Sequence, residues 1–427
     1  MGWDRFGQLK PRGSRDWYRS RTPEFARLCP FSPAAANEDE LARAAFPAAP
    51  AQDGRVGRFA AAYVGHVGEG EYRAQGSSGG LTSWLAAELL RTGRVDAVAH
   101  VAPRSGERLF GYRMSRTLDE VRAASKSRYY PIELSEVIRE IRAVPGRYAV
   151  IGIPCFIKAV QLLRKEDAII RERVTHTLGL VCGHMKSSRM VESFAWQLGE
   201  ELERVHSVEY RLKDETRPAN WYRAEIGLAD GGKVAGDWWH FVDGDWGAGF
   251  FQNSACNACD DVVAETADIA FGDAWVEPYS SDGRGTNVVI VRSDELHEMI
   301  KQAIAGGRLQ LEPVGADFVA ETQAAGLRHR REGLAYRLSW RRRGIIPVKR
   351  VAPMKARIPL RRRFVYRSRA VVSRLSHQVF ALARAVRRPS LYIRWGRVAL
   401  AVYQGLTYSR GTWGRWFDRL LGNQPAR

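Results

Sequence analysis

Apolar and polar positions alternate along residues 55–305 in a pattern that predicts strands followed by helices. Residues 147–153 form a short β-branched and apolar run, Pro154 interrupts it, and FIKAVQLLRK continues with apolar residues at helical spacing. Further apolar runs at 58–67, 95–101, 174–181, 267–275 and 285–292 predict strands, while 81–92 and 293–304 predict amphipathic helices. This alternation is typical of an α/β protein, and we predict a core built on a mixed sheet.

Two segments depart from this alternation. Residues 187–255 contain short alternating runs separated by polar turns, with a hairpin signal at Asp230-Gly231-Gly232, and they predict a β-rich insert. Residues 1–54 are rich in Arg, Pro and Ala and contain one short helix signal at 37–46, where Asn37 can serve as the N-cap. We expect this segment to be an N-terminal extension, whose role the sequence does not reveal.

The C-terminal residues 335–427 form a strongly basic tail. They hold 23 of the 66 Lys and Arg residues but one of the 47 Asp and Glu residues, whereas residues 1–334 are nearly neutral. We therefore predict three parts, 1–54, 55–334 and 335–427, and expect the tail to be separable from the rest. Apolar residues recur in the tail at helical spacing between arginines, namely Val371, Leu375, Val379, Leu382 and Val386.

Arginines beside such a stripe, with Trp413 and Trp416 further on, are typical of helices that lie on an anionic membrane surface. An acidic partner protein is an alternative, and nucleic acid is the less favoured one because the tail is rich in apolar residues. No uncharged apolar run reaches the ~20 residues that span a bilayer, and the N-terminus has no apolar signal segment. We expect a cytoplasmic protein that binds peripherally to the inner face of the membrane.

Four of the five cysteines lie where the chain turns. Cys155 and Cys182 each follow a predicted strand, and Cys256 and Cys259 form a C-x-x-C motif in the polar segment NSACNACDD. Packing as small apolar residues does not explain two thiols in one polar loop, and disulfides are rare in a reducing compartment. We predict a metal or cluster site. Four thiolates suit both Zn²⁺ and an iron–sulfur cluster, and the spacing does not choose between them.

Other segments carry candidate binding chemistry. A glycine- and serine-rich turn before a helix can present backbone N–H groups to a phosphate, or it can be a plain turn; this segment is Gly76, Ser77, Ser78, Gly79 and Gly80. In SKSRYYP, Lys126 and Arg128 can contact an anion and Tyr129 a ring system, although a solvated basic turn is the alternative.

Two residues beside the cysteines are candidate catalytic groups. Lys158 lies in the first turn after Cys155 and can stabilise a reduced cofactor, or it can be a surface lysine. His184 follows Cys182 and can donate a proton, or it can be a core histidine.

Several motifs together resemble the coenzyme F420 hydrogenase/dehydrogenase beta-subunit family, which includes divinyl chlorophyllide reductases and hydroxymethyl chlorophyll reductases. They are QGSSGGLTSWLAAELLRTGRVDAV, IGIPCFIKA, GLVCGHMKS, and CNACDD with ETADIAFGDAW, and they fall within residues 55–295. The resemblance implies an α/β oxidoreductase that uses FAD and one [4Fe–4S] cluster. It assigns the cluster to Cys155, Cys182, Cys256 and Cys259, and it matches Asp273 to the acid of the GDAW motif.

The same resemblance implies a ferredoxin-like or deazaflavin electron carrier and an organic substrate, with coenzyme F420 as a further candidate cofactor. Many members carry additional cluster cysteines near the N-terminus, but this chain has Cys29 alone there, so we expect a single cluster. A membrane-associated tail suggests envelope polysaccharide or lipid metabolism. The alternative of a different class is a scaffold stapled by a Cys₄ zinc site, with no redox activity.

Overall fold

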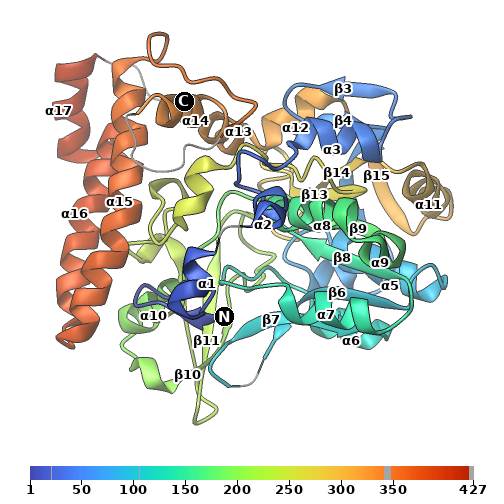
Figure 1. Cartoon of the computed structure of the whole chain (residues 1–427). Coiled ribbons are helices and arrows are strands. Elements are labelled where there is room, and N and C mark those ends of the chain that lie inside the picture. The colour runs from blue at the N-terminus through green and yellow to red at the C-terminus, as the bar shows by residue number, and fades with distance from the viewer. Residues whose placement is uncertain (21, 105, 341–347, 423–427) are drawn as a thin grey trace.

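An eight-stranded mixed sheet forms the centre of the computed structural model, which describes every residue except 21, 105, 341–347 and 423–427 (Figure 1). The strands lie in the order β15 (Leu309–Pro313), β5 (Ala61–Val67), β14 (Asn287–Val291), β13 (Ile269–Asp273), β9 (Val174–Leu180), β8 (Tyr148–Gly152), β6 (Ala97–Pro103) and β7 (Phe110–Ser115). Neighbours from β13 to β6 run parallel, and the other pairs are antiparallel. The predicted α/β class with a mixed sheet is confirmed.

Helices cover both faces of this sheet, which explains why the central strand β8 is buried at every position. Along β8, Ala149 and Ile151 face a cluster with helices α5 and α11, whereas Tyr148 and Val150 face a cluster with α7, α8 and α9. The helices of residues 1–338 are α1 (Arg15–Arg19), α2 (Pro23–Leu28), α3 (Glu38–Ala45), α4 (Tyr72–Gln75), α5 (Leu81–Arg91), α6 (Leu118–Ala123), α7 (Ser135–Ala143), α8 (Pro154–Glu166), α9 (Ala168–Arg173), α10 (Arg189–Gln197), α11 (Asp294–Ala305), α12 (Ala316–Thr322), α13 (Ala324–Arg330) and α14 (Glu332–Leu338).

Local signals in the sequence locate several of these elements correctly. The Asn37 side chain accepts a hydrogen bond from Glu40 N and forms a capping box at the start of α3. The hairpin at Asp230-Gly231-Gly232 joins two strands of a separate three-stranded sheet, β10 (Val205–Glu209), β11 (Arg223–Leu228) and β12 (Lys233–Asp237). The predicted β-rich insert is therefore present. Short hairpins β1–β2 (Gly2–Trp3, Leu9–Lys10) and β3–β4 (Ala51–Asp53, Gly57–Phe59) lie in the N-terminal extension or next to it.

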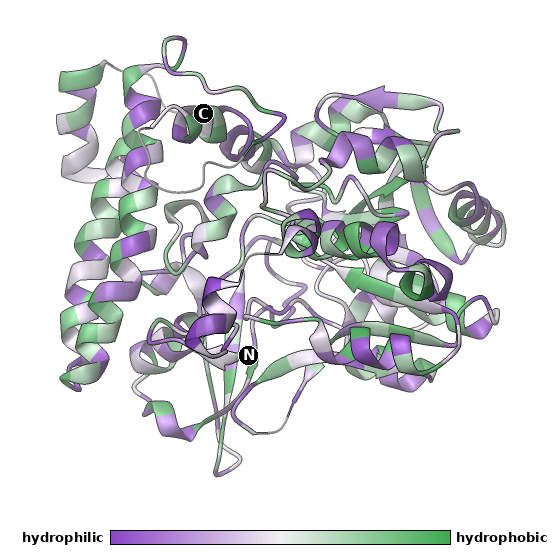
Figure 2. Cartoon of the chain, in the orientation of Figure 1, coloured by the Kyte–Doolittle hydropathy of each residue, from purple (hydrophilic) through white to green (hydrophobic). Residues whose placement is uncertain are grey.

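In the described part of the basic tail, the long helices α15 (Leu360–Ala385) and α16 (Pro389–Tyr408) lie side by side along one flank of the molecule, and the shorter α17 (Gly411–Leu421) follows at the end of α16 (Figure 1). Both α15 and α16 alternate apolar and polar residues along their length (Figure 2). Their inner side belongs to the same buried cluster as the insert, with Phe380 and Tyr392 packed against Phe251. No helix in the described ranges is both long enough and apolar enough to traverse a membrane.

The boundary that we predicted near residue 334 stays a prediction, but the packing changes what we expect of it. Helices α14 and α15 continue the buried core across that position, and Tyr336 and Tyr366 share a small apolar cluster there. Of the predicted stripe, Val371, Leu382 and Val386 are exposed, and Leu375 and Val379 are half-buried. The tail therefore combines a face that packs on the core with an exposed face.

Candidate functional site

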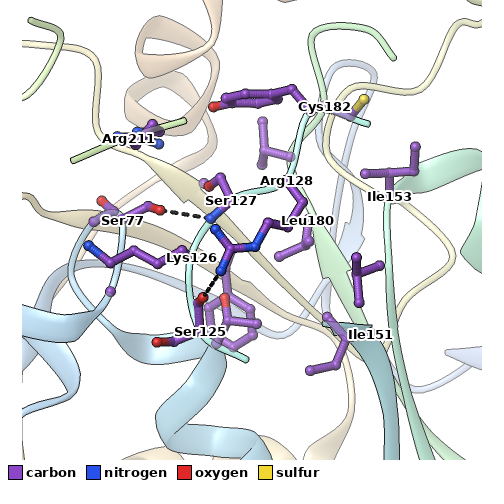
Figure 3. A pocket seen from close by; sticks show the side chains of 18 of the residues that line it. Ser77, Ser125, Lys126, Ser127, Arg128, Ile151, Ile153, Leu180, Cys182 and Arg211 are labelled. Carbon is purple, nitrogen blue, oxygen red and sulfur yellow. Dashed lines mark hydrogen bonds between the residues drawn. The ribbon is translucent and has the colours of Figure 1, made fainter. Parts of the chain in front are cut away.

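The carboxyl ends of the parallel strands β8, β9 and β13 open into a cavity of about 250 Å³ (Figure 3). Ile151, Leu180 and Phe271 give it an apolar floor, and the turns that follow these strands bring in Cys182, His184 and Asp273. This edge is where ligands bind in open α/β sheets. A mainly apolar cavity with a few converging polar groups is the usual form of a site for a small molecule or cofactor.

The predicted glycine- and serine-rich turn forms one wall, with Gly76, Ser77, Ser78 and Gly80 lining the cavity. Ser77 Oγ accepts a hydrogen bond from Ser127 N at 2.8 Å, so this turn and the SKSRYYP segment hold each other in place (Figure 3). Gly80 has φ +85°, a left-handed conformation that glycine adopts without strain.

Gly79 does not line the cavity. A Cβ there would lie 2.8 Å from Gly65 O and 2.9 Å from Asn287 N, in the backbones of β5 and β14. Glycine is therefore required at 79 by the packing of the turn against the sheet. A larger residue at this position would test the fold and not the binding of a ligand.

Three predicted binding residues, Lys126, Arg128 and Tyr129, also line the cavity. Arg128 donates to Glu209 Oε2 at 3.1 Å and to Ser125 O at 3.0 Å, so its charge is partly used within the protein. Lys126 makes no hydrogen bond or ion pair with any described residue, and burial lowers its pKa. It has φ +93°, an unusual backbone conformation for a lysine. Lys126 is thus the cation in this wall that remains available to an anionic ligand.

Asp273 pairs with a residue that the sequence analysis missed. Arg211 donates two hydrogen bonds to its carboxylate, at 2.9 and 3.1 Å, and packs against the ring of Tyr222 at 4.4 Å. Burial lowers the pKa of Arg211, and the negative charge of Asp273 raises it. The second effect is larger, so the pKa of Arg211 lies above its ordinary value. Both residues line the cavity, and the salt bridge between them orients its polar side.

Lys213, also missed, braces the glycine- and serine-rich turn from a smaller adjoining pocket that shares Ser77 and Arg211 with the cavity. Its ammonium donates to Ser78 O at 3.0 Å, to Arg284 O at 2.7 Å and to Arg73 O. The signal was present in the alternation of YRLKD, since residues 211 and 213 project to the same side of an extended chain.

His184 lies in the cavity wall, fully buried and stacked on Trp246 at 4.3 Å between ring centroids. Burial lowers the pKa of His184, and the charges of Lys186 and Arg369 lower it further, so the imidazole is neutral at neutral pH. Arg369 Nη2 lies 3.4 Å from His184 Nδ1, and His184 Nε2 has no hydrogen-bond partner among the described residues. An unpartnered ring nitrogen can hydrogen-bond a ligand, and the predicted proton-donor role of His184 stays untested.

Lys186, two residues after His184, is a buried lysine whose effect on protein stability should depend on pH. It is 1% exposed and donates to Phe250 O at 2.6 Å, and burial lowers its pKa to about 7. The unfolded lysine keeps its proton up to about pH 10, so between pH 7 and 10 the unfolded state binds more protons. We expect the stability of the wild type, relative to Lys186→Met, to rise from pH 7 to pH 9 by at most about 1.4 kcal/mol per pH unit. Thermal unfolding of both proteins at pH 7, 8 and 9 measures this, and a constant difference would contradict it.

The four predicted cysteine ligands come from three segments. Cys155 lies in the first turn of α8, Cys182 follows β9, and Cys256 and Cys259 lie at the 3₁₀ turn η4 (Ser254–Ala258). Met185 N donates to Cys256 Sγ at 3.3 Å, which joins the Cys182 loop to the C-x-x-C loop. Burial raises the pKa of Cys182 to about 12 and that of Cys259 to about 11, and neighbouring thiols contribute to both shifts.

The same two causes act on Cys155. Burial raises its pKa, and the other three thiols raise it further. The four cysteines thus lie within electrostatic reach of one another. Their role as metal ligands stays a prediction. Within the described ranges, no group of three or more His, Cys, Asp or Glu side chains is arranged so that it could hold a metal ion.

Lys158 lies elsewhere. Its ammonium is buried and donates to Glu38 Oε1 of helix α3 at 3.0 Å, and Lys158 is not among the residues that line the cavity. It therefore belongs to a buried ionic network that ties the N-terminal extension to α8. We expect a structural role for it, while its predicted catalytic role remains untested.

Comparisons with known proteins agree with this architecture. Two family models match the chain, and they describe the N-terminal and the C-terminal part of the coenzyme F420 hydrogenase/dehydrogenase beta subunit; the first matches residues 62–139 and the second residues 146–317. A chain of the F420-reducing [NiFe] hydrogenase complex from Methanosarcina barkeri is similar in fold, with a TM-score of 0.52 and 17% identity, covering 68% of this chain and 95% of that chain. No curated protein matches the sequence.

Proposed function

The chain belongs to the coenzyme F420 hydrogenase/dehydrogenase beta-subunit family, and from this premise we propose that it is an oxidoreductase that uses FAD and one [4Fe–4S] cluster. It would exchange electrons between a ferredoxin-like or deazaflavin carrier, such as coenzyme F420, and an organic substrate. The observation that carries the proposal is the position of Cys182. Cys182 lines the cavity and also belongs to the group of four interacting thiols, so a bound cofactor and a cluster would be neighbours.

The lining of the cavity suits a flavin, whereas the support for the cluster is the donor set of four thiols and not a metal-holding geometry. Lys126 can meet a phosphate or another anionic group, and the apolar floor can receive a planar ring system beside His184 and Trp246. When bound, a flavin supplies the chemistry that links one-electron and two-electron transfer. The protein's own contribution is to orient the ring through the Arg211–Asp273 pair and to keep water from its apolar side. Cys155, Cys182, Cys256 and Cys259 would hold the cluster.

Metal and cofactor analysis of anaerobically purified protein tests this function. We expect acid-labile sulfide with about four irons per chain, together with flavin. Stoichiometric zinc without sulfide would overturn the proposal and favour the non-redox scaffold. Adding reduced F420 or reduced ferredoxin to the purified protein should bleach its flavin absorbance, and the carrier that does so identifies the physiological class of donor.

Lys126 provides a direct test of the cavity. Asparagine tolerates positive φ better than most residues, so Lys126→Asn removes the cation and preserves the turn. We expect the Kd for FAD, measured by titrating flavin-depleted protein, to rise about tenfold because one charged contact is lost. Lys10→Asn, an exposed lysine in β2, is the control and should leave the Kd unchanged. Equal affinities for all three proteins would place the flavin phosphate elsewhere.

We also propose that the exposed side of the three C-terminal helices contacts an anionic membrane surface, which would place the enzyme near envelope lipid or polysaccharide substrates. Four large apolar side chains of these helices are 50–60% exposed, and arginines lie near them in the sequence. They are Leu382, Val398, Trp416 and Leu420. Arginine beside exposed tryptophan and leucine is typical of a helix that lies in the membrane interface.

Vesicle binding tests this placement. We expect the full chain to sediment with vesicles of phosphatidylcholine and phosphatidylglycerol, and we expect binding to weaken with salt without vanishing, because apolar contacts are not screened. The double substitution Trp413→Ala and Trp416→Ala should reduce binding several-fold. Trp221→Ala, an exposed tryptophan of the insert, is the matched control. Complete loss at high salt would indicate an acidic protein or nucleic acid instead.

A further inference from the structure

Arg330 is the last residue of helix α13 and lies beyond the residues that the family models match. It is 2% exposed, and its Nη2 donates to Gly183 O at 2.6 Å and to Cys182 O at 3.2 Å. Its Nε and Nη1 are buried and have no hydrogen-bond partner among the described residues. A side chain from the C-terminal part of the chain thus closes over the loop that carries Cys182.

A buried guanidinium with two unpartnered nitrogens, which carry three N–H groups, is costly unless a negative charge lies near it. Within the described part of the chain, no carboxylate forms an ion pair with Arg330, and the chain has no further acid next to it in sequence except Glu332. Its two hydrogen-bond partners are backbone oxygens of the loop that carries Cys182, so a compensating negative charge would come from the cysteine site.

We propose that Arg330 is the fixed counter-charge of the cysteine site. Its two hydrogen bonds position the Cys182–Gly183 loop, and its charge offsets the negative charge of four thiolates and the cluster that they would bind. This inference rests on the proposed function, since it assumes that the thiols hold a cluster. Reduction of a cluster adds one negative charge, so a buried cation beside it favours the reduced form and raises the midpoint potential.

The experiment compares cluster content and midpoint potential in the full-length protein and three variants. Arg330→Gln keeps hydrogen-bond donors and removes the charge, whereas Arg330→Lys keeps the charge and loses the planar fork. Arg328→Gln removes the same charge from a half-buried position on the same helix and is the matched control. Iron and sulfide are assayed anaerobically, and the potential is read from a redox titration followed by the spectrum of the cluster.

We expect Arg330→Gln to make reduction about tenfold less favourable, a fall of ~59 mV for a one-electron couple. Arg330→Lys and Arg328→Gln should stay close to the wild type. Equal potentials in Arg330→Gln and the wild type would overturn the inference, and so would equal falls in Arg330→Gln and Arg330→Lys, since the effect would then come from hydrogen bonding.

Two further outcomes are also decisive. If Arg330→Gln does not fold, the midpoint potential of Arg330→Lys decides the question. A potential equal to that of the wild type supports the counter-charge, and a fall of ~59 mV refutes it. Wild-type protein without iron and sulfide would refute the proposed function itself. If the wild type holds the cluster and Arg330→Gln has the same midpoint potential as the wild type, only this inference is refuted.

Discussion

Cys256→Ser is expected to abolish the proposed iron–sulfur cluster. Cys256 joins the two loops of the site, because its sulfur accepts the hydrogen bond from Met185 N in the loop that follows Cys182. Serine keeps the size of the side chain, but its hydroxyl does not ionise to a ligand near neutral pH as a thiol does. We expect iron and acid-labile sulfide in anaerobically purified Cys256→Ser to fall to less than about a tenth of the wild-type content.

Cys29→Ser is the matched control for this prediction. Cys29 is a free cysteine at the end of α2, is half-buried, and comes from the N-terminal extension. Cys29→Ser should therefore retain the full content of iron and sulfide. A Cys256→Ser protein that holds as much cluster as Cys29→Ser would show that the C-x-x-C motif is not part of the site.

Removal of residues 335–427 is expected to prevent the remainder from folding to a soluble, cofactor-binding protein. The sequence led us to expect a separable tail, but the packing reverses that expectation. Phe251, which is fully buried, packs against Phe380 and Tyr392 at 5.4 and 5.5 Å, and its backbone N–H donates to Ser376 Oγ at 2.9 Å. The truncation would expose several such rings, and burial of each contributes about 1.5–3 kcal/mol to the free energy of unfolding. Their sum is a large part of the about 5–15 kcal/mol by which a typical protein is stable.

The truncation would also dismantle the cysteine site. Arg337 Nε donates to Asn257 O at 2.9 Å, inside the C-x-x-C motif, and Ser373 Oγ donates to Gln252 O at 3.1 Å just before it. We therefore expect the truncated chain to appear in the insoluble fraction, or to lack iron and flavin if it is soluble. A soluble truncated protein with a full set of cofactors would contradict this and restore the boundary near residue 334.

Two point substitutions in α15 test whether its buried face, and not the helix as a whole, stabilises the protein. Phe380→Ala empties a buried position and should lower the free energy of unfolding by about 3–5 kcal/mol. Leu382→Ala, two residues along the same helix and 54% exposed, should change it by less than about 0.5 kcal/mol. Chemical denaturation followed by tryptophan fluorescence measures both. Equal effects would show that α15 does not pack as described.

The sequence by itself determined the local elements and the residues at the edge of the sheet. Apolar runs ending on Pro154-Cys155 and on Cys182-Gly183 located β8 and β9, since strand length and turn residues are encoded within a few positions. The same holds for the capping box at Asn37 and the hairpin at Gly231-Gly232. Because parallel strands end at the same edge, these local assignments were sufficient to predict that Cys182 and the glycine- and serine-rich turn lie at one edge of the sheet.

Only the tertiary structure decided which charged residues serve the site. Arg330 reaches the Cys182 loop from 148 positions away, and Arg211 reaches Asp273 across 62 positions. Conversely, Lys158 follows Cys155 by three positions but pairs with Glu38, and Gly79 serves the sheet and not the cavity. Periodicity reports which face of an element is apolar, but it carries no information about which distant group lies opposite a given charge.

The tail shows the same limit most clearly. Its composition indicated helices with an apolar side and a basic side, and the described residues 360–421 form such helices. Composition alone could not show that the side with Val372, Phe380 and Ala383 packs against the insert while Leu382 faces outward. From the sequence alone, an arginine in a basic segment is expected to be exposed to solvent. Burial of such a charge depends on contacts that form only when segments far apart in the sequence come together.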